Sequence, residues 1–571
     1  MKTATTKKIK SNISVRRNDH AAAEQLEMRI APAGLILAVY DPATHALTLT
    51  GDDLDNKVAI FQTSATTWRV EGRDTFGTDP VLETAINVLG ETQFDVGAIA
   101  KLNIVTKGGA DRVEITNLYH LTAFSADMGA GDDSLKTEGF RVKGNAAFTT
   151  GPGVDNIEFD GNLGRITGNL SITDSGDGLT FTFRAERTHI GGNVTYTGSA
   201  GVDTLTMTTD TMLTVGKGID FTANGGNDRL VFGNEGTVAI GRGAQGRSVF
   251  YHGGDGNDRI AINSSIVTLG GSVEMDGGNG NDTLDVDGLR VSIGESRAGI
   301  SVRLNGEAGK DQTDLQGSTL IVAGLIQMDG GAGDDLLDLS SVHRLSLRGG
   351  THFTGGAGFD EFRLGADALH VRGDLFFDGG DDIDEAEVEA NGIIHGAITL
   401  HLGGATAGDQ IAAVLGRSGM RDSLEITGAL TVDATGDAAA NDDCKLTSLK
   451  LGGPLSIKLG EGASTVDMDN VNALAVIIET RGGNDEVVIE GDGNFGISTF
   501  RHRTTILLGA GDDTLLIGEG SEDNLVSFRR NVTTDGGEGT DTRNDTAADN
   551  EFGDAARFMA SAFEVVLPPA M

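Results

Sequence analysis

The segment from Gly253 to Val388 repeats one short motif six times, and this repetition restricts the possible fold more than any other feature does. The motif reads G-G-x-G-x-D-x-U, where U is apolar, and its copies begin at residues 253, 277, 306, 330, 355 and 379. Glu307 replaces the second glycine of the third copy, and Asp382 replaces the third glycine of the last copy. The aspartates of the six copies are Asp258, Asp282, Asp311, Asp335, Asp360 and Asp384. They recur roughly every 25 residues, and a fixed period of this length predicts a stack of similar structural units.

Apolar residues alternate with polar ones between the motifs, which indicates three short strands per repeat. In the repeat after Asp282 the apolar positions are Leu284, Val286, Val291, Ile293, Ile300, Val302 and Leu304. Such short strands cannot bury an apolar face alone, but stacked repeats share a continuous core. The predicted fold is all-β: a parallel β-helix (β-solenoid) with about 25 residues per coil and Gly-Asp turns stacked along one edge. Its predicted hand is right, as for nearly all parallel crossovers.

Degenerate copies of the turn, such as Gly129–Asp133 and Gly509–Asp513, lie on both sides of the central segment. We therefore predict a basic leader or sorting segment at 1–33, an N-terminal cap with the first irregular coils at 34–100, the β-helix at 101–545 and a C-terminal cap at 546–571. The only tryptophan, Trp68, is expected to be a buried residue of the N-terminal cap rather than a platform for a ligand.

The formal net charge of −40 restricts the partners of the chain. Such a surface repels nucleic acid and anionic lipid and attracts cations. An alternative is that the charge only keeps a long solenoid soluble. The single cysteine, Cys444, excludes an internal disulfide and a zinc site built from several thiolates. No stretch is apolar over the length of a bilayer, so no membrane span is predicted.

The central motif resembles the calcium-binding nonapeptide of RTX-type (haemolysin-type) repeats. The resemblance implies that carboxylates and glycine-turn carbonyls of adjacent coils share calcium ions. The candidate ligands are the six aspartates of the central segment together with Asp133 and Asp513. The chain departs from the family because RTX rolls carry two motifs in each shorter coil, whereas here each coil carries one. In the alternative reading, aspartates of plain Gly-Asp turns bond backbone N–H groups without any ion.

The basic N-terminal segment contains Leu26-Glu27-Met28-Arg29. It resembles the LEPR-type leader of large surface and secreted proteins in planctomycetes and related bacteria, although Met28 stands where proline or aspartate is common. The resemblance implies a secreted or cell-surface location, with Ala31-Pro32-Ala33 as a candidate processing point. A short amphipathic helix without a sorting role is the alternative.

Two functions follow from this pattern. The first is a secreted or cell-surface structural, adhesive solenoid that binds calcium and contacts a cell-envelope or matrix polysaccharide. The second is a carbohydrate-active enzyme, a polysaccharide lyase or hydrolase, which the β-helix favours by fold analogy alone. His343, His352 and His370 lie in neighbouring repeats and are the histidines that an enzyme would align. Asp, Lys and Arg clustered in a groove across three coils would favour the enzyme, and a uniformly acidic surface the structural protein.

Overall fold

The computed structural model describes residues 34–73, 84–87, 91–241, 243, 246–294, 299–403, 410–416, 423–435, 441–490, 496–518, 524–544, 551–552 and 558–567. The predicted leader at 1–33 lies outside these residues. The chain divides into two compact units, an N-terminal unit at Met1–Glu186 and a C-terminal unit at Arg187–Met571. Each unit is described separately.

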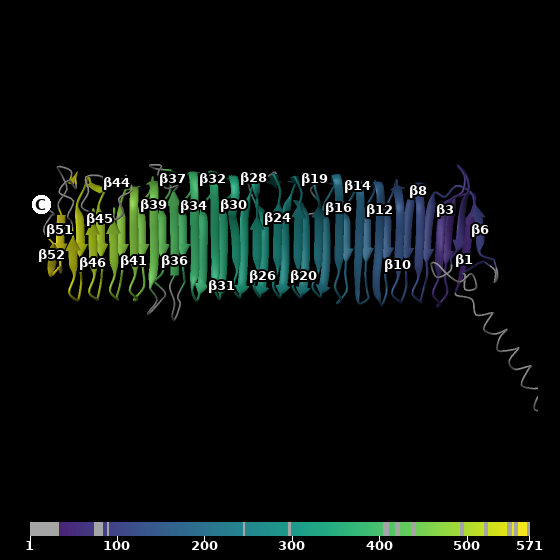
Figure 1. The fold of residues 1–571 in the computed structure, drawn as a ribbon, viewed down its shortest axis with the longest axis horizontal. Coiled ribbons are helices and arrows are strands. Elements are labelled where there is room, and N and C mark those ends of the chain that lie inside the picture. Colours follow the sequence, from purple (N-terminus) through teal and green to yellow (C-terminus); the bar gives the residue numbers. More distant parts are fainter. Residues whose placement is uncertain are drawn as a thin grey trace, which may run out of the picture. The chain divides into compact units, whose positions relative to one another are not determined.

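One coil of the C-terminal unit illustrates the construction. Strand β23 (Ser272–Asn279) runs into a Gly-Asp turn, and β24 (Thr283–Asp287) and β25 (Arg290–Ile293) follow it. We name the sheet built from strands that lead into the turns sheet I, and the sheet built from strands that leave them sheet II. Successive coils pair in parallel, as at Val273 and Val302, and Figure 1 shows these strands side by side in chain order.

In the C-terminal unit, sheet I consists of β15 (Val194–Thr197), β17 (Ile219–Gly225), β20 (Arg247–Asp255), β23, β26 (Ile300–Ala308), β29 (Leu325–Ala332), β31 (Thr351–Ala357), β33 (Leu375–Asp381), β35 (Ile398–His401), β38 (Leu430–Asp433), β40 (Leu455–Lys458), β42 (Val476–Glu479), β45 (Thr504–Leu507), β48 (Val532–Asp535) and β51 (Phe558–Ser561).

Sheet II of the same unit consists of β16 (Thr204–Val215), β18 (Arg229–Gly233), β19 (Thr237–Ile240), β21 (Arg259–Asn263), β22 (Ile266–Leu269), β24, β25, β27 (Gln312–Leu315), β28 (Gly317–Val322), β30 (Leu336–Leu347), β32 (Asp360–Val371), β34 (Asp384–Ile394), β36 (Gln410–Gly416), β37 (Leu424–Ile426), β39 (Asp442–Leu451), β41 (Thr465–Ala473), β43 (Glu486–Ile489), β44 (Gly496–Phe500), β46 (Thr514–Ile517), β47 (Asn524–Phe528), β49 (Thr542–Asn544), β50 (Glu551–Phe552) and β52 (Val565–Leu567).

The N-terminal unit repeats the two-sheet plan but begins differently. Its sheet I strands are β1 (Leu35–Asp41), β2 (Ala46–Thr50), β5 (Ala85–Ile86), β7 (Lys101–Val105), β9 (Ala123–Asp127), β11 (Ala146–Thr149) and β13 (Leu170–Thr173). Its sheet II strands are β3 (Lys57–Gln62), β4 (Trp68–Gly72), β6 (Gln93–Val96), β8 (Arg112–Leu121), β10 (Ser134–Val142) and β12 (Val154–Ile166), and β14 (Gly178–Ile190) contains the unit boundary. The pairs β1–β2, β3–β4 and β4–β6 are antiparallel, whereas β2–β7 and β3–β8 are parallel. Trp68 is buried on β4.

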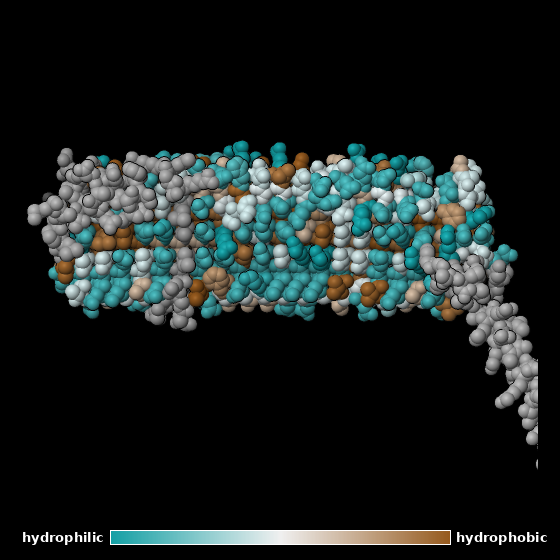
Figure 2. Space-filling view, in the orientation of Figure 1, coloured by the Kyte–Doolittle hydropathy of each residue, from teal (hydrophilic) through white to brown (hydrophobic). Residues whose placement is uncertain are grey.

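The core is the column of apolar side chains between the two sheets. Leu284, Val286, Val291, Ile293, Val302 and Leu304 are all fully buried, as their alternation predicts. Burying such side chains contributes roughly 1.5–3 kcal/mol each relative to leaving them exposed. Ile300 is only half-buried, contrary to the predicted alternation, because the pairing register shifts between Ile300 and Val302 and turns its side chain outward. The face seen in Figure 2 is mainly hydrophilic over the described residues, with hydrophobic residues exposed in places.

The predicted all-β parallel solenoid is therefore confirmed, with one correction to its strands. In β30, β32 and β34 the second and third strands of the coil join into one long strand with a register irregularity. Coils in the central segment are 24, 29 or 25 residues apart in register, as shown by Gly254, Gly278, Glu307, Gly331 and Gly356. No helix among the described residues is long and apolar enough to cross a membrane.

Candidate functional site

The six motif aspartates form one buried ladder in the C-terminal unit. The backbone N–H of each of the first five aspartates donates a hydrogen bond to Oδ1 of the aspartate one coil later. The N–O distances are 2.8 Å for Asp258 to Asp282, 2.8 Å for Asp282 to Asp311, 2.7 Å for Asp311 to Asp335, 2.9 Å for Asp335 to Asp360 and 3.1 Å for Asp360 to Asp384. Each side chain is at most 1% exposed, so each hydrogen bond lies in a water-poor environment.

The two other candidate ligands belong to separate ladders of the same kind. Asp133 accepts the N–H of Asp111, and its own N–H donates to Asp155. Asp513 accepts the N–H of Asp485, and its own N–H donates to Asp541. The structure therefore brings the central six together but not Asp133 or Asp513 with them. The predicted ligand set omitted other buried ladder aspartates, namely Asp111, Asp155, Asp203, Asp228, Asp485 and Asp541. Their turns have lost glycines but kept the aspartate, except that the turn of Asp541 keeps all three glycines and lacks the apolar residue, which is Arg543.

Glycine at the first motif position has a steric role. No left-handed φ occurs at Gly277 or Gly306, whereas Gly278 and Gly280 adopt φ of 99° and 131°. A Cβ on Gly277 would lie 2.0 Å from Oδ2 of Asp282. The first glycine is therefore needed to leave room for the carboxylate, whereas the second and third supply the positive φ that side chains rarely adopt.

The space beside the first glycine is lined by oxygen acceptors. The Cβ position of Gly306 lies 2.0 Å from Oδ2 of Asp311 and 2.4 Å from the carbonyl oxygen of Gly330 in the next coil. Oδ2 is buried and has no hydrogen-bond partner in Asp282, Asp311, Asp335, Asp360 and Asp384. A buried carboxylate oxygen without a donor is costly, so a proton or a cation must compensate it.

Burial changes the acidity of the ladder. It raises the pKa of Asp282, Asp360 and Asp384 to about 8 and that of Asp311 to about 7. Burial raises the pKa of Asp335 only to about 6, partly because the charge of Lys310 opposes the shift. The pKa of Asp258 is also raised by burial, against the backbone N–H of Asp228 and the facing hydroxyl of Tyr251.

Three turns carry threonine at the first position instead of glycine. Thr106, Thr150 and Thr480 precede Asp111, Asp155 and Asp485 by five residues. Burial raises the pKa of these three aspartates to about 6, and the facing threonine hydroxyl opposes a larger rise. The well-formed hydrogen bonds of Thr106 and Thr480 go to the carbonyl oxygens of Met128 and Leu508, so their contact with the carboxyl is a weaker one.

A second ladder of opposite direction runs along the exposed edge of the turns. At the fifth motif position, Oδ1 of Asn257 accepts the N–H of Asn281 at 2.8 Å, and Oδ1 of Asn281 accepts the N–H of Lys310 at 2.7 Å. The sequence analysis did not assign this position, although its recurrent Asn or Asp was visible there. The two ladders together bind each turn to both of its neighbours.

The oxygen atoms of the turns are the kind of ligand that a hard cation prefers, but too few of them meet at one point to complete its coordination. Calcium takes six to eight oxygen ligands. Each central turn offers a carboxylate oxygen beside its first glycine, and a carbonyl oxygen of the next coil converges on it at Gly253 and Gly306. Within the described ranges, no group of three or more His, Cys, Asp or Glu side chains gathers in a way that holds a metal ion. Any cation here would depend mainly on backbone carbonyls.

The three histidines that an enzyme could have aligned do not come together, and the interpretation favoured from the sequence is that they are satisfied or exposed. His343 and His370 lie in sheet II, on β30 and β32, whereas His352 lies in sheet I on β31. His343 pairs with Asp367, and His352 stacks on Phe376 with ring centroids 4.5 Å apart. Neighbouring repeats thus place these histidines on different sheets.

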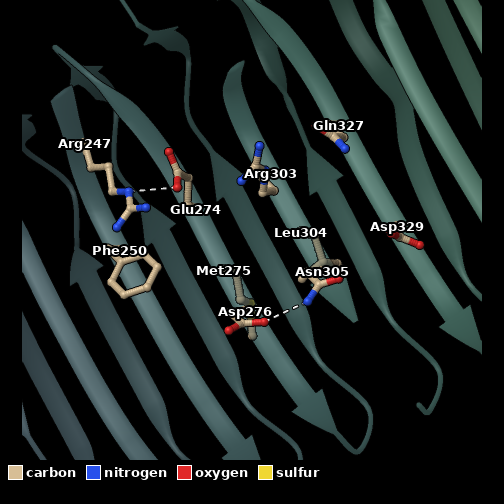
Figure 3. A pocket seen from close by; sticks show the side chains of 10 residues that line it. All are labelled: Arg247, Phe250, Glu274, Met275, Asp276, Arg303, Leu304, Asn305, Gln327 and Asp329. Carbon is tan, nitrogen blue, oxygen red and sulfur yellow. Dashed lines mark hydrogen bonds and ion pairs between the residues drawn. The ribbon is translucent and has the colours of Figure 1, made fainter. Parts of the chain in front are cut away.

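A polar hollow of about 340 Å³ lies on the outward face of sheet I (Figure 3). Its lining side chains come from four successive strands, β20, β23, β26 and β29. They include Arg247, Glu274, Asp276, Arg303 and Asp329. Acidic and basic side chains therefore lie together across adjacent coils in this hollow, which is the kind of cluster expected to favour a carbohydrate-active enzyme, although its basic groups are arginines only.

No family model matches the chain, and the searches of curated proteins and of solved structures find no match either.

Proposed function

We propose that this protein is a secreted or cell-surface structural solenoid with an adhesive role, whose stacked Gly-Asp turns bind calcium. The observation that carries the proposal is the buried ladder, in which rung after rung presents a carboxylate oxygen without a donor. At Asp311 a carbonyl oxygen of the following coil converges on the same point. A cation shared at such points would couple each coil to the next.

The chemistry of the turns favours calcium over transition metals. Oxygen ligands and a flexible coordination geometry suit calcium, whereas zinc and copper prefer imidazole and thiolate groups. The central turns contain neither histidine nor cysteine between Gly277 and Asp282 or between Gly330 and Asp335. One carboxylate per turn implies weak binding, in the range of about 10⁻⁴–10⁻³ M that is typical of extracellular calcium modules. Such affinities suit the secreted or surface location that the leader suggests.

Calorimetry and thermal unfolding of the full chain, with calcium and with EGTA, test the proposal. Binding to the folded state alone must raise the unfolding temperature. Asp282→Asn and Asp335→Asn are the decisive variants, because an amide keeps the Oδ1 acceptor and replaces Oδ2 by a donor. We expect each to lose part of the calcium uptake while folding normally. Asp287→Asn removes the same charge from an exposed position of sheet II and is the matched control.

The competing explanation is a proton on Oδ2, and the same experiment separates the two. If the ladder carboxyls are neutral, calcium gives no binding heat and no thermal shift, and Asp282→Asn resembles the wild type in both buffers. That result would reject calcium and leave a purely structural ladder.

A further inference from the structure

The hollow on sheet I is built from two columns of outward side chains. Parallel pairing aligns Phe250, Glu274, Arg303 and Gln327 in one column, and Asp276, Asn305 and Asp329 in the next. Figure 3 shows these side chains on neighbouring strands around one hollow. Because strands in a sheet are about 4.8 Å apart, each column presents one group per rung.

Part of the lining is fixed by internal pairing. Nε of Arg247 lies 2.8 Å from Oε2 of Glu274, and its guanidinium lies 4.2 Å from the ring centroid of Phe250. Nδ2 of Asn305 donates to Oδ1 of Asp276 at 2.8 Å. These contacts hold one side of the hollow in a defined geometry before any ligand arrives, which lowers the entropy cost of binding.

The other side of the hollow is unengaged. Nε of Arg303 is buried and has no hydrogen-bond partner. The side chains of Gln327 and Asp329 make no hydrogen bond or ion pair with other residues in the described part of the chain. The guanidinium of Arg303, the amide of Gln327 and the carboxylate of Asp329 thus line the hollow without internal partners among the described residues, as a donor, a group with both functions and an acceptor. Nε of Arg303 is itself out of reach of a ligand and carries the free-energy cost of a buried N–H without an acceptor.

The charges and shape select the class of ligand. A phosphate, sulfate or nucleic acid would approach three carboxylates with only one unpaired guanidinium to receive it. A metal cation would meet the positive charge of Arg303. A neutral polyol avoids both conflicts, because vicinal hydroxyls donate and accept together and pair with planar guanidinium, amide and carboxylate groups. We propose that this hollow binds a sugar unit of a neutral polysaccharide.

The same column continues into an aromatic surface. Gln327 pairs with His352, and His352 with Phe376, in the next two coils. The His352 and Phe376 rings are nearly parallel, at 11°, and His401 meets the edge of Phe376 with ring centroids 5.7 Å apart. A second hollow of about 340 Å³ opens beside His352 and Phe376. Aromatic rings with a polar edge suit the apolar face and hydroxyl rim of a pyranose.

The chain of the polysaccharide runs along the stacking direction of the coils. The rung spacing of about 4.8 Å is close to the length of one pyranose unit in an extended chain. Successive units then meet the Arg303–Asp329 group and afterwards the His352–Phe376 pair. The inference specifies the partner in the proposed adhesive role, so it rests on that role but not on calcium binding. It uses none of the ladder aspartates.

Affinity electrophoresis of the full chain in gels containing xylan, galactomannan or a β-1,3-glucan tests the site, with polygalacturonate and dextran sulfate as acidic probes. Runs in calcium and in EGTA are compared. We expect retardation by at least one neutral chain, and a tenfold or larger loss of affinity in Arg303→Leu and in Asp329→Asn. Arg290→Leu and Asp287→Asn make the same changes at exposed positions of sheet II and should bind normally.

The outcomes are independent of calcium binding. Retardation by a neutral chain that is lost in Arg303→Leu supports the site even where calorimetry detects no calcium. Retardation by none of the neutral chains, retardation by the acidic ones only, or full binding by Arg303→Leu overturns it, even where calcium raises the unfolding temperature. Unfolding temperatures of the variants within the wild-type range show that a lost affinity is not a lost fold.

Discussion

Turns with glycine first and turns with threonine first use the same aspartate ladder but surround it differently. In the Gly-first turns, such as the one ending at Asp282, the carboxylate oxygen occupies the place of a missing Cβ and finds no donor. In the Thr-first turns ending at Asp111 and Asp485, Oδ2 is also buried without a hydrogen-bond partner, but a threonine side chain stands where the Gly-first turns are open. The pKa of these carboxyls rises only to about 6, a value that Asp335 shares among the Gly-first turns. The ladder hydrogen bond is therefore common to both, whereas an acceptor-lined space belongs to the Gly-first turns.

The comparison separates two roles that one motif combines. The aspartate holds adjacent coils together, because its Oδ1 accepts the N–H of the preceding coil in the Gly-first turn of Asp282 and in the Thr-first turns of Asp155 and Asp485. The first glycine has a separate role, because a Cβ on Gly277 would lie 2.0 Å from Oδ2 of Asp282. The proposed cation would lie in the space that this glycine leaves beside the carboxylate, and a threonine side chain stands at that position in the Thr-first turns.

The largest expected effect is on the pH dependence of stability in EGTA. The pKa of Asp282 and Asp384 rises from 3.8 to about 8 on folding, so the folded state favours the neutral carboxyl. The contribution of these carboxyls to stability is therefore fully present below about pH 4 and is lost as the pH rises towards 8. Thermal unfolding between pH 4 and 9 measures this loss. Calcium should restore stability at the alkaline end, and a flat profile in EGTA would contradict the raised pKa values.

Removing a rung should cost the next largest amount. Asp282→Ala leaves the buried N–H of Asp258 without its acceptor and should lower stability by about 2–3 kcal/mol. Urea unfolding measures the loss, and hydrogen exchange of the Asp258 amide shows whether it is local. An unchanged exchange rate at Asp258 would mean that the ladder hydrogen bond does not form in solution.

Exchanging the first residue between the two kinds of turn tests the comparison directly. Gly277→Thr should remove the cation at Asp282, and Thr480→Gly should open a space beside Asp485 that takes one up. Calcium stoichiometry from calorimetry is expected to fall in the first variant and rise in the second. Equal stoichiometry in both would show that the first residue does not control the ion.

The exposed ladder should matter least. Asn281→Ala removes the acceptor for the N–H of Lys310, but water replaces it because the position is exposed. We expect a loss of about 0.5–1 kcal/mol in urea unfolding. A loss as large as that of Asp282→Ala would mean that exposure does not distinguish the two ladders.

Much of the fold follows from sequence periodicity alone. Alternation identified Leu284 and Val286 as core residues, and the motif period gave the coil length. Ile300 escaped this reasoning because a register shift depends on how two coils meet and not on local pattern. His352 escaped it as well, because nearness in the sequence does not say which sheet a residue joins.

The candidate site was predictable only in part. The spacing revealed the aspartates as a column, but the hydrogen bond from one coil to the next carboxylate depends on stacking geometry. The open groups Arg303 and Asp329 share no motif, since they lie 26 residues apart and meet only through parallel pairing of β26 with β29. Whether calcium binds beside Asp133 and Asp513 stays a prediction.

The inner ladder has a direction. From Asp203 to Asp360, each rung takes its carboxylate from the coil that follows in the chain, so a coil is unfinished until its successor has been made. During synthesis, each new turn would therefore supply the carboxylate that completes the ladder hydrogen bond of the turn made before it. At Asp541 the N–H bonds Oε2 of Glu564 at 2.9 Å, so a longer acid replaces the aspartate as the clasp. A chain cut before Glu564 would leave the N–H of Asp541 without this acceptor, and a carboxylate of another copy could then accept its hydrogen bond.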